Sequence, residues 1–186
     1  MREIEVGQLG ADWCGGAKAA VLWLDDSAIG MVARDWPSPA PENIWLSGTM
    51  LTDPMALDER LSTIARIAYG TALPEERDVL LARSTGWLRI RRVLSAEWPN
   101  EQANAYFTLK AAGSSLVRIG GYFKRDYFLE NFEHMIDNAS YTSVYPRMGL
   151  APDQRFVSKG AVIAAFDSED ATRLVPLTDW QVPGQN

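Results

Sequence analysis

The sequence has one cysteine and one histidine among its 186 residues, Cys14 and His134. A single thiol cannot form an internal disulfide, and no charged-then-apolar leader opens the chain, so we expect a reducing, cytoplasmic location. A single imidazole excludes histidine-rich zinc sites and any mechanism that needs two histidines. We therefore predict neither a bound metal nor a cofactor.

Long apolar runs and an excess of basic residues are also missing. The longest apolar stretches, 19–24 and 160–166, fall far short of the roughly 20 residues that span a bilayer. The formal charge of −6 disfavours nucleic acid and anionic membranes, because phosphate contacts need clustered Lys and Arg. We predict a soluble protein that binds neither.

Hydrophobic residues, by contrast, are plentiful. They make up 47% of the chain and charged residues 23%, which is ordinary for a globular protein. A chain of 186 residues lies within the size that one core supports. We predict one globular domain over residues 1–186. Alternating prolines at 36–41 block helix and remove ladder donors, so this stretch is expected to be an extended surface connection.

Hydrophobic periodicity predicts the fold class α+β, with a mixed or antiparallel sheet packed against about four helices. Strands are predicted at 2–6, 19–24, 28–34, 115–123, 161–166 and 173–175, the second and third forming a hairpin. Helices are predicted at 54–69, 74–84, 101–112 and 126–137, with Gly70, Gly86 and Gly113 ending the first three. The first helix should bury a stripe of Leu57, Leu61 and Ile64. Residues 87–98 fit both periods, and we favour helix.

Cys14 lies in the string Trp13-Cys14-Gly15-Gly16-Ala17-Lys18, which resembles the Trp-Cys-Gly-Pro-Cys-Lys site of the thioredoxin family. The resemblance implies a reactive thiol at Cys14, but Ala17 stands where the family has its second cysteine. A thiolate at a helix N-terminus or beside Lys18 would have a lowered pKa and could act as a lone nucleophile. Free cysteine is also among the most buried residue types, and we favour a structural role for Cys14.

His134 is a second candidate for chemistry. Glu130 lies four residues before it and Tyr127 seven residues before it, on one flank of the helix predicted at 126–137. The imidazole could act there as a general acid or base, with Glu130 as its partner. The alternative, which we favour, is a histidine that only hydrogen-bonds a neighbouring carboxylate.

Arg89, Arg91 and Arg92 form the one tight basic cluster, between Trp87 and Trp98. Guanidinium groups beside aromatic rings could bind an acidic partner or a phosphate. The alternative is a solvated face whose charges pair with nearby acids.

Residues 122–145 carry more aromatic side chains than one helix stripe and one strand face can bury. Tyr127, Tyr141 and Tyr145 are therefore candidates for an exposed or cleft-lining surface, because tyrosine combines apolar area with a hydroxyl. Tyrosines at the edge of a core would give the same pattern. The full set is Tyr122, Phe123, Tyr127, Phe128, Phe132, Tyr141 and Tyr145.

No catalytic signature emerges from these motifs. Our leading hypothesis is an intracellular, non-enzymatic protein-binding protein of the inhibitor or immunity type, which acts through an acidic, aromatic-rich surface. One alternative is a small cytosolic enzyme with a cleft near Cys14 or near Tyr127 and His134. A homo-oligomeric structural subunit is the other.

Overall fold

The computed structural model describes residues 13–93, 98–121, 123–137, 143–150 and 156–182. The chain divides into two compact units, which we call the sheet unit (1–70 and 160–186) and the helical unit (71–159). Their helices and mixed sheet confirm the predicted α+β class. The single domain over residues 1–186 stays a prediction, and the strand predicted at 2–6 lies outside the described residues.

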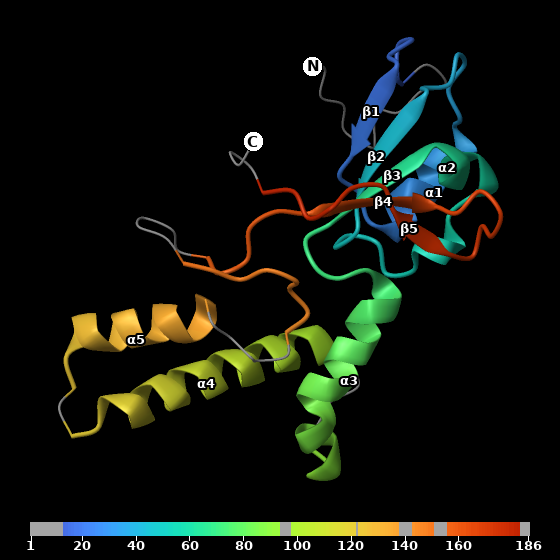
Figure 1. The fold of residues 1–186 in the computed structure, drawn as a ribbon. Coiled ribbons are helices and arrows are strands. Elements are labelled where there is room, and N and C mark those ends of the chain that lie inside the picture. The colour runs from blue at the N-terminus through green and yellow to red at the C-terminus, as the bar shows by residue number, and fades with distance from the viewer. Residues whose placement is uncertain (1–12, 94–97, 122, 138–142, 151–155, 183–186) are drawn as a thin grey trace. The chain divides into compact units, whose positions relative to one another are not determined.

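A five-stranded mixed sheet forms the centre of the sheet unit in the part of the chain described (Figure 1). Strands β1 to β3 pair in parallel, β4 is antiparallel to β3, and β5 is antiparallel to β4. Strands β4 and β5 confirm the strands predicted at 161–166 and 173–175. In spatial order the strands are β1 (Ala19–Leu22), β2 (Asn43–Ser47), β3 (Ala65–Tyr69), β4 (Val162–Phe166) and β5 (Leu174–Pro176).

Helix α1 (Asp26–Arg34) replaces the strand predicted at 28–34, so the predicted hairpin is wrong. Parallel strands such as β1 and β2 need a crossover connection, which a helix supplies and a tight turn cannot. The Asp25 carboxylate accepts a hydrogen bond from the Ala28 amide at 2.9 Å and so caps the helix. Ile29 and Val32 on this helix are buried. The polar residues 25–27, at the expected turn of the hairpin, therefore begin a helix instead.

The helix predicted over 54–69 is also wrong in its second half. The chain forms a 3-10 turn η2 (Pro54–Ala56) and then helix α2 (Glu59–Ile64). Strand β3 follows α2 directly, with no residue between them. Burial alternates along β3, with Ala65, Ile67 and Tyr69 buried, as expected for a strand of period two inside a sheet. Leu61 is fully buried, as predicted, whereas Leu57 and Ile64 are only half-buried.

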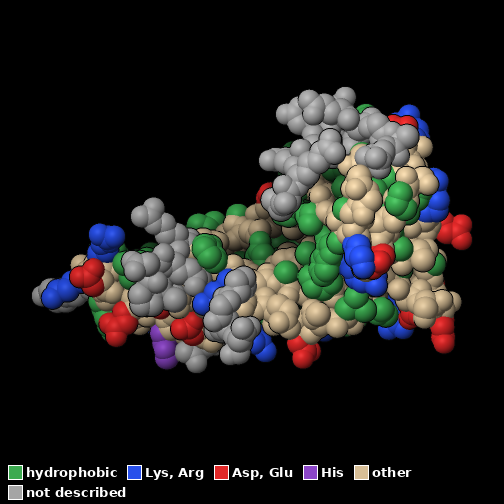
Figure 2. Space-filling model, turned by 90° about the horizontal axis from the view of Figure 1, so that it is seen from above, with side chains coloured by type: hydrophobic (Ala, Val, Ile, Leu, Met, Phe, Trp, Pro, Cys, Tyr) green, Lys and Arg blue, Asp and Glu red, His purple; other side chains and the backbone are tan. Residues whose placement is uncertain are grey.

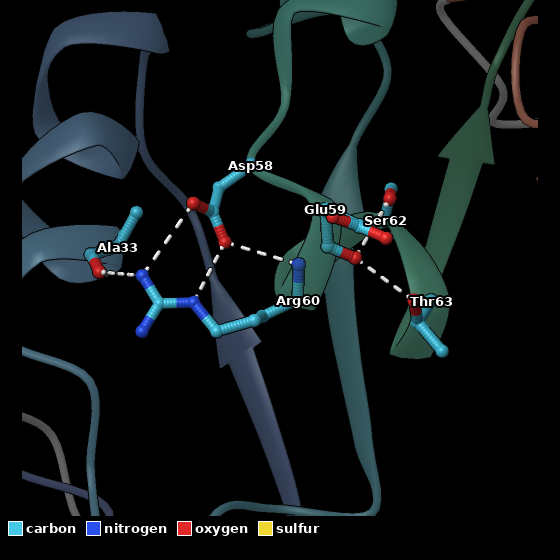
Figure 3. Close-up of polar contacts among 6 residues, drawn as sticks. All are labelled: Ala33, Asp58, Glu59, Arg60, Ser62 and Thr63. Carbon is cyan, nitrogen blue, oxygen red and sulfur yellow. Dashed lines mark hydrogen bonds and ion pairs between the residues drawn. The ribbon is translucent and has the colours of Figure 1, made fainter.

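Arg60 connects α2 to the end of α1 (Figure 3). The Asp58 carboxylate accepts hydrogen bonds from the backbone amide and the Nε of Arg60, both at 3.0 Å. Arg60 Nη2 donates to the carbonyl of Ala33 at 2.9 Å, and the guanidinium lies 5.4 Å from the centroid of the Trp36 ring. The hydrogen bonds from Arg60 lower the pKa of the Asp58 carboxyl. The Arg60 side chain thus connects α2 to the C-terminal end of α1 within the sheet unit.

The helical unit consists, over its described residues, of α3 (Pro74–Ile90), α4 (Pro99–Ile119) and α5 (Arg125–Asp137). Helix α4 packs against both α3 and α5. The helix predicted at 126–137 is confirmed. On this helix Met135 and Ile136 are buried, while Phe128 and Phe132 are half-buried and stack on one another with centroids 5.9 Å apart.

Helix α3 runs through Gly86, where we predicted that it would end. The Thr85 hydroxyl donates to the carbonyl of Leu81 at 2.6 Å, so the polar side chain is satisfied inside the helix. Residues 87–90 are helical, as favoured, but α3 ends at Ile90, so the helix favoured over 87–98 is wrong at residues 91–93 and 98. Residues 94–97 lie outside the described residues. The 36–41 connection contains neither helix nor strand, as the proline pattern predicts. Pro37 and Pro41 are buried, so the connection does not lie wholly at the surface as expected.

Helix α4 likewise continues through Gly113, and the strand predicted at 115–123 is wrong. The Ser115 hydroxyl donates to the carbonyl of Ala111 at 3.0 Å. The helix ends at Gly120, whose φ of +69° lies in the region that glycine adopts readily. A glycine does end α4, but it is Gly120 and not the predicted Gly113.

Candidate functional site

The helical unit leaves many large apolar side chains exposed. In Figure 2, hydrophobic side chains reach the surface among Lys, Arg, Asp and Glu. Contiguous exposed apolar surface in a folded protein often marks an interaction site. The exposed large apolar residues of this unit, among those described, are Val79, Trp87, Ile90, Val93, Trp98, Leu109, Leu116, Val117, Phe123, Tyr127, Leu129 and Phe156.

Charge is divided unequally between the two units. The sheet unit has six Lys and Arg residues against fourteen Asp and Glu, a net charge of −8. The helical unit has twelve against ten, a net charge of +2. The acidic excess of the chain and the larger share of its exposed aromatic surface therefore belong to different units.

Two aromatic rings and two cations form an ordered row across α3 and α4. The rings of Trp87 and Tyr106 stack with centroids 6.3 Å apart and planes 20° apart. The Arg91 guanidinium carbon lies 5.4 Å from the Trp87 ring centroid, and Lys110 Nζ lies 5.9 Å from that of Tyr106. Each cation follows its ring by four residues, which is about one helical turn. We call these four residues the aromatic ladder.

The end of α3 holds the first cation of the ladder in place. The Arg91 amide donates to the Trp87 carbonyl at 3.1 Å, so the chain stays helical to that residue. Arg92 then adopts a φ of +57° and turns the chain away. A guanidinium stacked on a ring uses its face and leaves its in-plane N–H groups able to bind a carboxylate. Trp87 is 52% exposed, so a partner can reach this pair.

These contacts are the basis for a functional interpretation. No family model, curated protein or solved structure matches the chain. What the surface can bind therefore follows from the ladder itself, a basic and aromatic row suited to carboxylates and to apolar side chains.

The basic cluster predicted from sequence lies at the C-terminal end of α3. Arg89, Arg91 and Arg92 are all exposed there, and Arg91 is the member that stacks on a ring. Sequence reasoning missed Tyr106 and Lys110, the α4 half of the ladder. The repeated spacing of four residues between ring and cation is the signal that could have found them.

The three predicted tyrosines have different surroundings. Tyr127 on α5 is 47% exposed. Tyr145 is half-buried, and its hydroxyl accepts a hydrogen bond from Asn104 Nδ2 at 3.2 Å. Tyr141 lies outside the described residues. Tyr145 is thus held by α4, while the role of these tyrosines in binding stays a prediction.

The catalytic candidates fall in different units. Cys14 is half-buried in a turn ahead of β1, and its thiol donates to the carbonyl of Pro39 at 3.3 Å. Glu130 and His134 are exposed on α5. The described ranges contain no group of three His, Cys, Asp or Glu side chains placed to hold a metal. Within the same ranges, no helix is both long and apolar enough to cross a bilayer.

An open hollow of about 500 Å³ lies on α4 and α5. Cys14, Glu130 and His134 are not among its described lining residues, and no described acidic side chain lines it. The described part of its walls therefore offers no carboxylate for acid and base catalysis. The lining residues are Leu109, Lys110, Gly113, Ser114, Val117, Arg118 and Met135.

Proposed function

We propose that this chain is a non-enzymatic protein-binding protein of the inhibitor or immunity type, and that the aromatic ladder is the centre of its binding surface. The observation that carries the proposal is the stack of Arg91, Trp87, Tyr106 and Lys110, in which Tyr106 is half-buried and the other three residues are exposed. Trp, Tyr and Arg are the residues most enriched among those that dominate binding energy at protein interfaces.

The chemistry of the ladder selects an acidic partner surface. Two cations at the ends of a stacked ring pair favour carboxylates, and the rings between them favour an apolar side chain. Electrostatic attraction of this kind raises the rate of encounter and disfavours basic partners. The sequence hypothesis placed binding on an acidic surface, whereas the ladder makes a basic surface the better candidate.

A protein suits the ladder better than a nucleic acid does. The helical unit has a net charge of only +2, and the sheet unit joined to it has −8. A phosphate backbone would be repelled by that acidic excess, since tight binding needs several clustered cations without nearby acids.

A cytoplasmic location is part of this proposal, because the Cys14 thiol has no second cysteine in the chain to pair with.

The test is affinity capture from the native source with the wild-type chain and with Arg91→Glu. Arg147→Glu is the matched control, since Arg147 is exposed in the same unit but is not part of the ladder. We expect a stoichiometric protein partner that wild type and Arg147→Glu retain and Arg91→Glu loses. A partner retained equally by all three chains would refute the role of the ladder, and no partner at all would refute the binding function.

A further inference from the structure

Helix α4 carries a stripe of exposed apolar side chains. Leu109, Leu116 and Val117 are 73%, 48% and 82% exposed. They lie at positions i, i+7 and i+8, which is the spacing of one helix face. Such a stripe is normally buried against another element. The residues that α4 does bury are Ala103, Ala111, Ser115 and Ile119.

Gly113 lies in the middle of this stripe and on the wall of the hollow. Glycine inside a helix lowers helix stability relative to alanine. A Cβ added at Gly113 would meet nothing within 4 Å, so no described neighbour requires glycine there. The missing side chain instead leaves space for an apolar group from outside.

Two cations line one side of this space. Lys110 and Arg118 lie in the hollow eight residues apart, about 12 Å along the helix axis, and helix geometry places both on the same side of the row of Leu109, Gly113 and Val117. The rest of the lining is apolar apart from Ser114. An occupant must therefore combine an apolar face with negative charge along one flank of that face.

We infer that the hollow binds an acidic amphipathic helix of a partner protein. The inference rests on the proposed binding function and names the kind of segment bound. A helix that lies along α4 would place apolar residues one turn apart over Gly113 and Val117. Carboxylates two turns apart on that helix would match the separation of Lys110 and Arg118.

Charge makes a second copy of this chain a poor occupant. If two α4 helices packed antiparallel about Gly113, Lys110 of one copy would lie within about one turn of Arg118 of the other, and such like-charge juxtaposition disfavours a complex. If they packed in parallel, the described lining of the second hollow would offer no carboxylate to either cation. The acidic partner helix has no such conflict.

The experiment selects binders from a display library of helical peptides about 16 residues long, a length that covers the stripe with one turn to spare at each end. Apolar residues vary on one peptide face, and Glu, Gln and Lys vary on its flanks. The full chain is the target. We expect enrichment of peptides with Glu residues two turns apart on one flank, and an affinity that falls at least about tenfold in Gly113→Leu and in Arg118→Glu. Arg147→Glu is the control and should bind like wild type.

Gly113→Leu fills the hollow where the structure has room for a Cβ, so the melting temperature should not fall. Failure to enrich peptides, enrichment of Lys flanks, or binding that Gly113→Leu leaves unchanged would overturn the inference. So would a dimer, seen by light scattering, that Gly113→Leu dissociates. Binding to phosphatidylcholine and phosphatidylserine vesicles that Arg118→Glu abolishes would also overturn it, in favour of a membrane.

The two proposals fail separately in these experiments. Lys110 belongs to both sites, so the variants that separate them lie elsewhere: Arg118 and Gly113 are not in the aromatic ladder, and Arg91 does not line the hollow. A native partner lost in Arg91→Glu but retained in Gly113→Leu would leave the binding function standing and remove the inferred helix site.

Discussion

Trp87 and Tyr106 stack across α3 and α4 with ring centroids 6.3 Å apart, although Trp87 is 52% exposed. Such a pair contributes roughly 0.5–1.5 kcal/mol beyond its buried area. Its exposure and its flanking cations distinguish it from a core contact, because a ring kept only for stability would be better covered. The pair therefore joins two helices, and its exposed member Trp87 can also take part in the binding that we propose.

Leu61 should be a main contributor to the stability of the sheet unit. It is fully buried on α2, so Leu61→Ala should lower the free energy of unfolding by roughly 2–5 kcal/mol. Met55→Ala is the control, since Met55 is 41% exposed and its loss should cost far less. Urea denaturation of both variants checks this. Equal effects would contradict the placement of Leu61.

Two glycines should respond in opposite directions to alanine. Gly86 lies inside α3 with nothing within 4 Å of an added Cβ, so Gly86→Ala should raise stability by about 0.5–1 kcal/mol. An added Cβ at Gly48 would collide with the ring of buried Tyr69, so Gly48→Ala should destabilise. Thermal melts of the two variants measure both signs, and destabilisation by Gly86→Ala would contradict an unbroken α3.

The pair of Asp58 and Arg60 should make stability depend on pH. Hydrogen bonds from Arg60 hold the pKa of Asp58 below its ordinary value of 3.8. A lowered folded-state pKa adds stability above pH 3.8 that disappears as the pH falls through the folded value. The stability difference between wild type and Asp58→Asn, measured by denaturation, should therefore be constant near neutral pH and shrink below about pH 4. A difference that grows on acidification would contradict the pair.

Cys14 should be dispensable for binding. Its thiol donates to the Pro39 carbonyl, and a serine hydroxyl can donate there too. Cys14→Ser should leave partner affinity, measured by calorimetry with the captured partner, within about threefold of wild type. Loss of all activity in a folded Cys14→Ser chain would instead support a reactive thiol.

Local patterns predicted those elements whose signals agree over their whole length. Helix α5 and strand β4 were predicted at nearly their observed bounds. The helix prediction failed at residues 65–69 because Leu61, Ile64 and Ala68 keep a helical spacing, while Ala65, Ile67 and Tyr69 alternate as a strand does. Pairing with β2 and β4 decides between the two patterns. Sheet partners distant in sequence thus override the local signal.

Glycine misled the prediction of α3 and α4 for a similar reason. Gly86 and Gly113 lower local helix propensity, but packing of α3 on α4 and of α4 on α5 keeps both helices continuous. The predicted helix end at Gly113 also hid part of the candidate site. Because the predicted helix stopped there, Leu109 and Val117 could not be recognised as one stripe on one helix. Arg91 and Trp87 were found because they are close in sequence, whereas Tyr106 was missed because it is not.

The affinity of the captured partner for Trp87→Ala, compared with Trp98→Ala, tests the central claim most directly. Both tryptophans are exposed, at 52% and 58%, but only Trp87 stacks in the ladder. Loss of a central anchor costs about 2 kcal/mol or more, so Trp87→Ala should weaken binding about thirtyfold. Trp98→Ala should stay within about threefold, and circular dichroism should show both variants folded. Equal affinities of the two folded variants would contradict the ladder as the binding site.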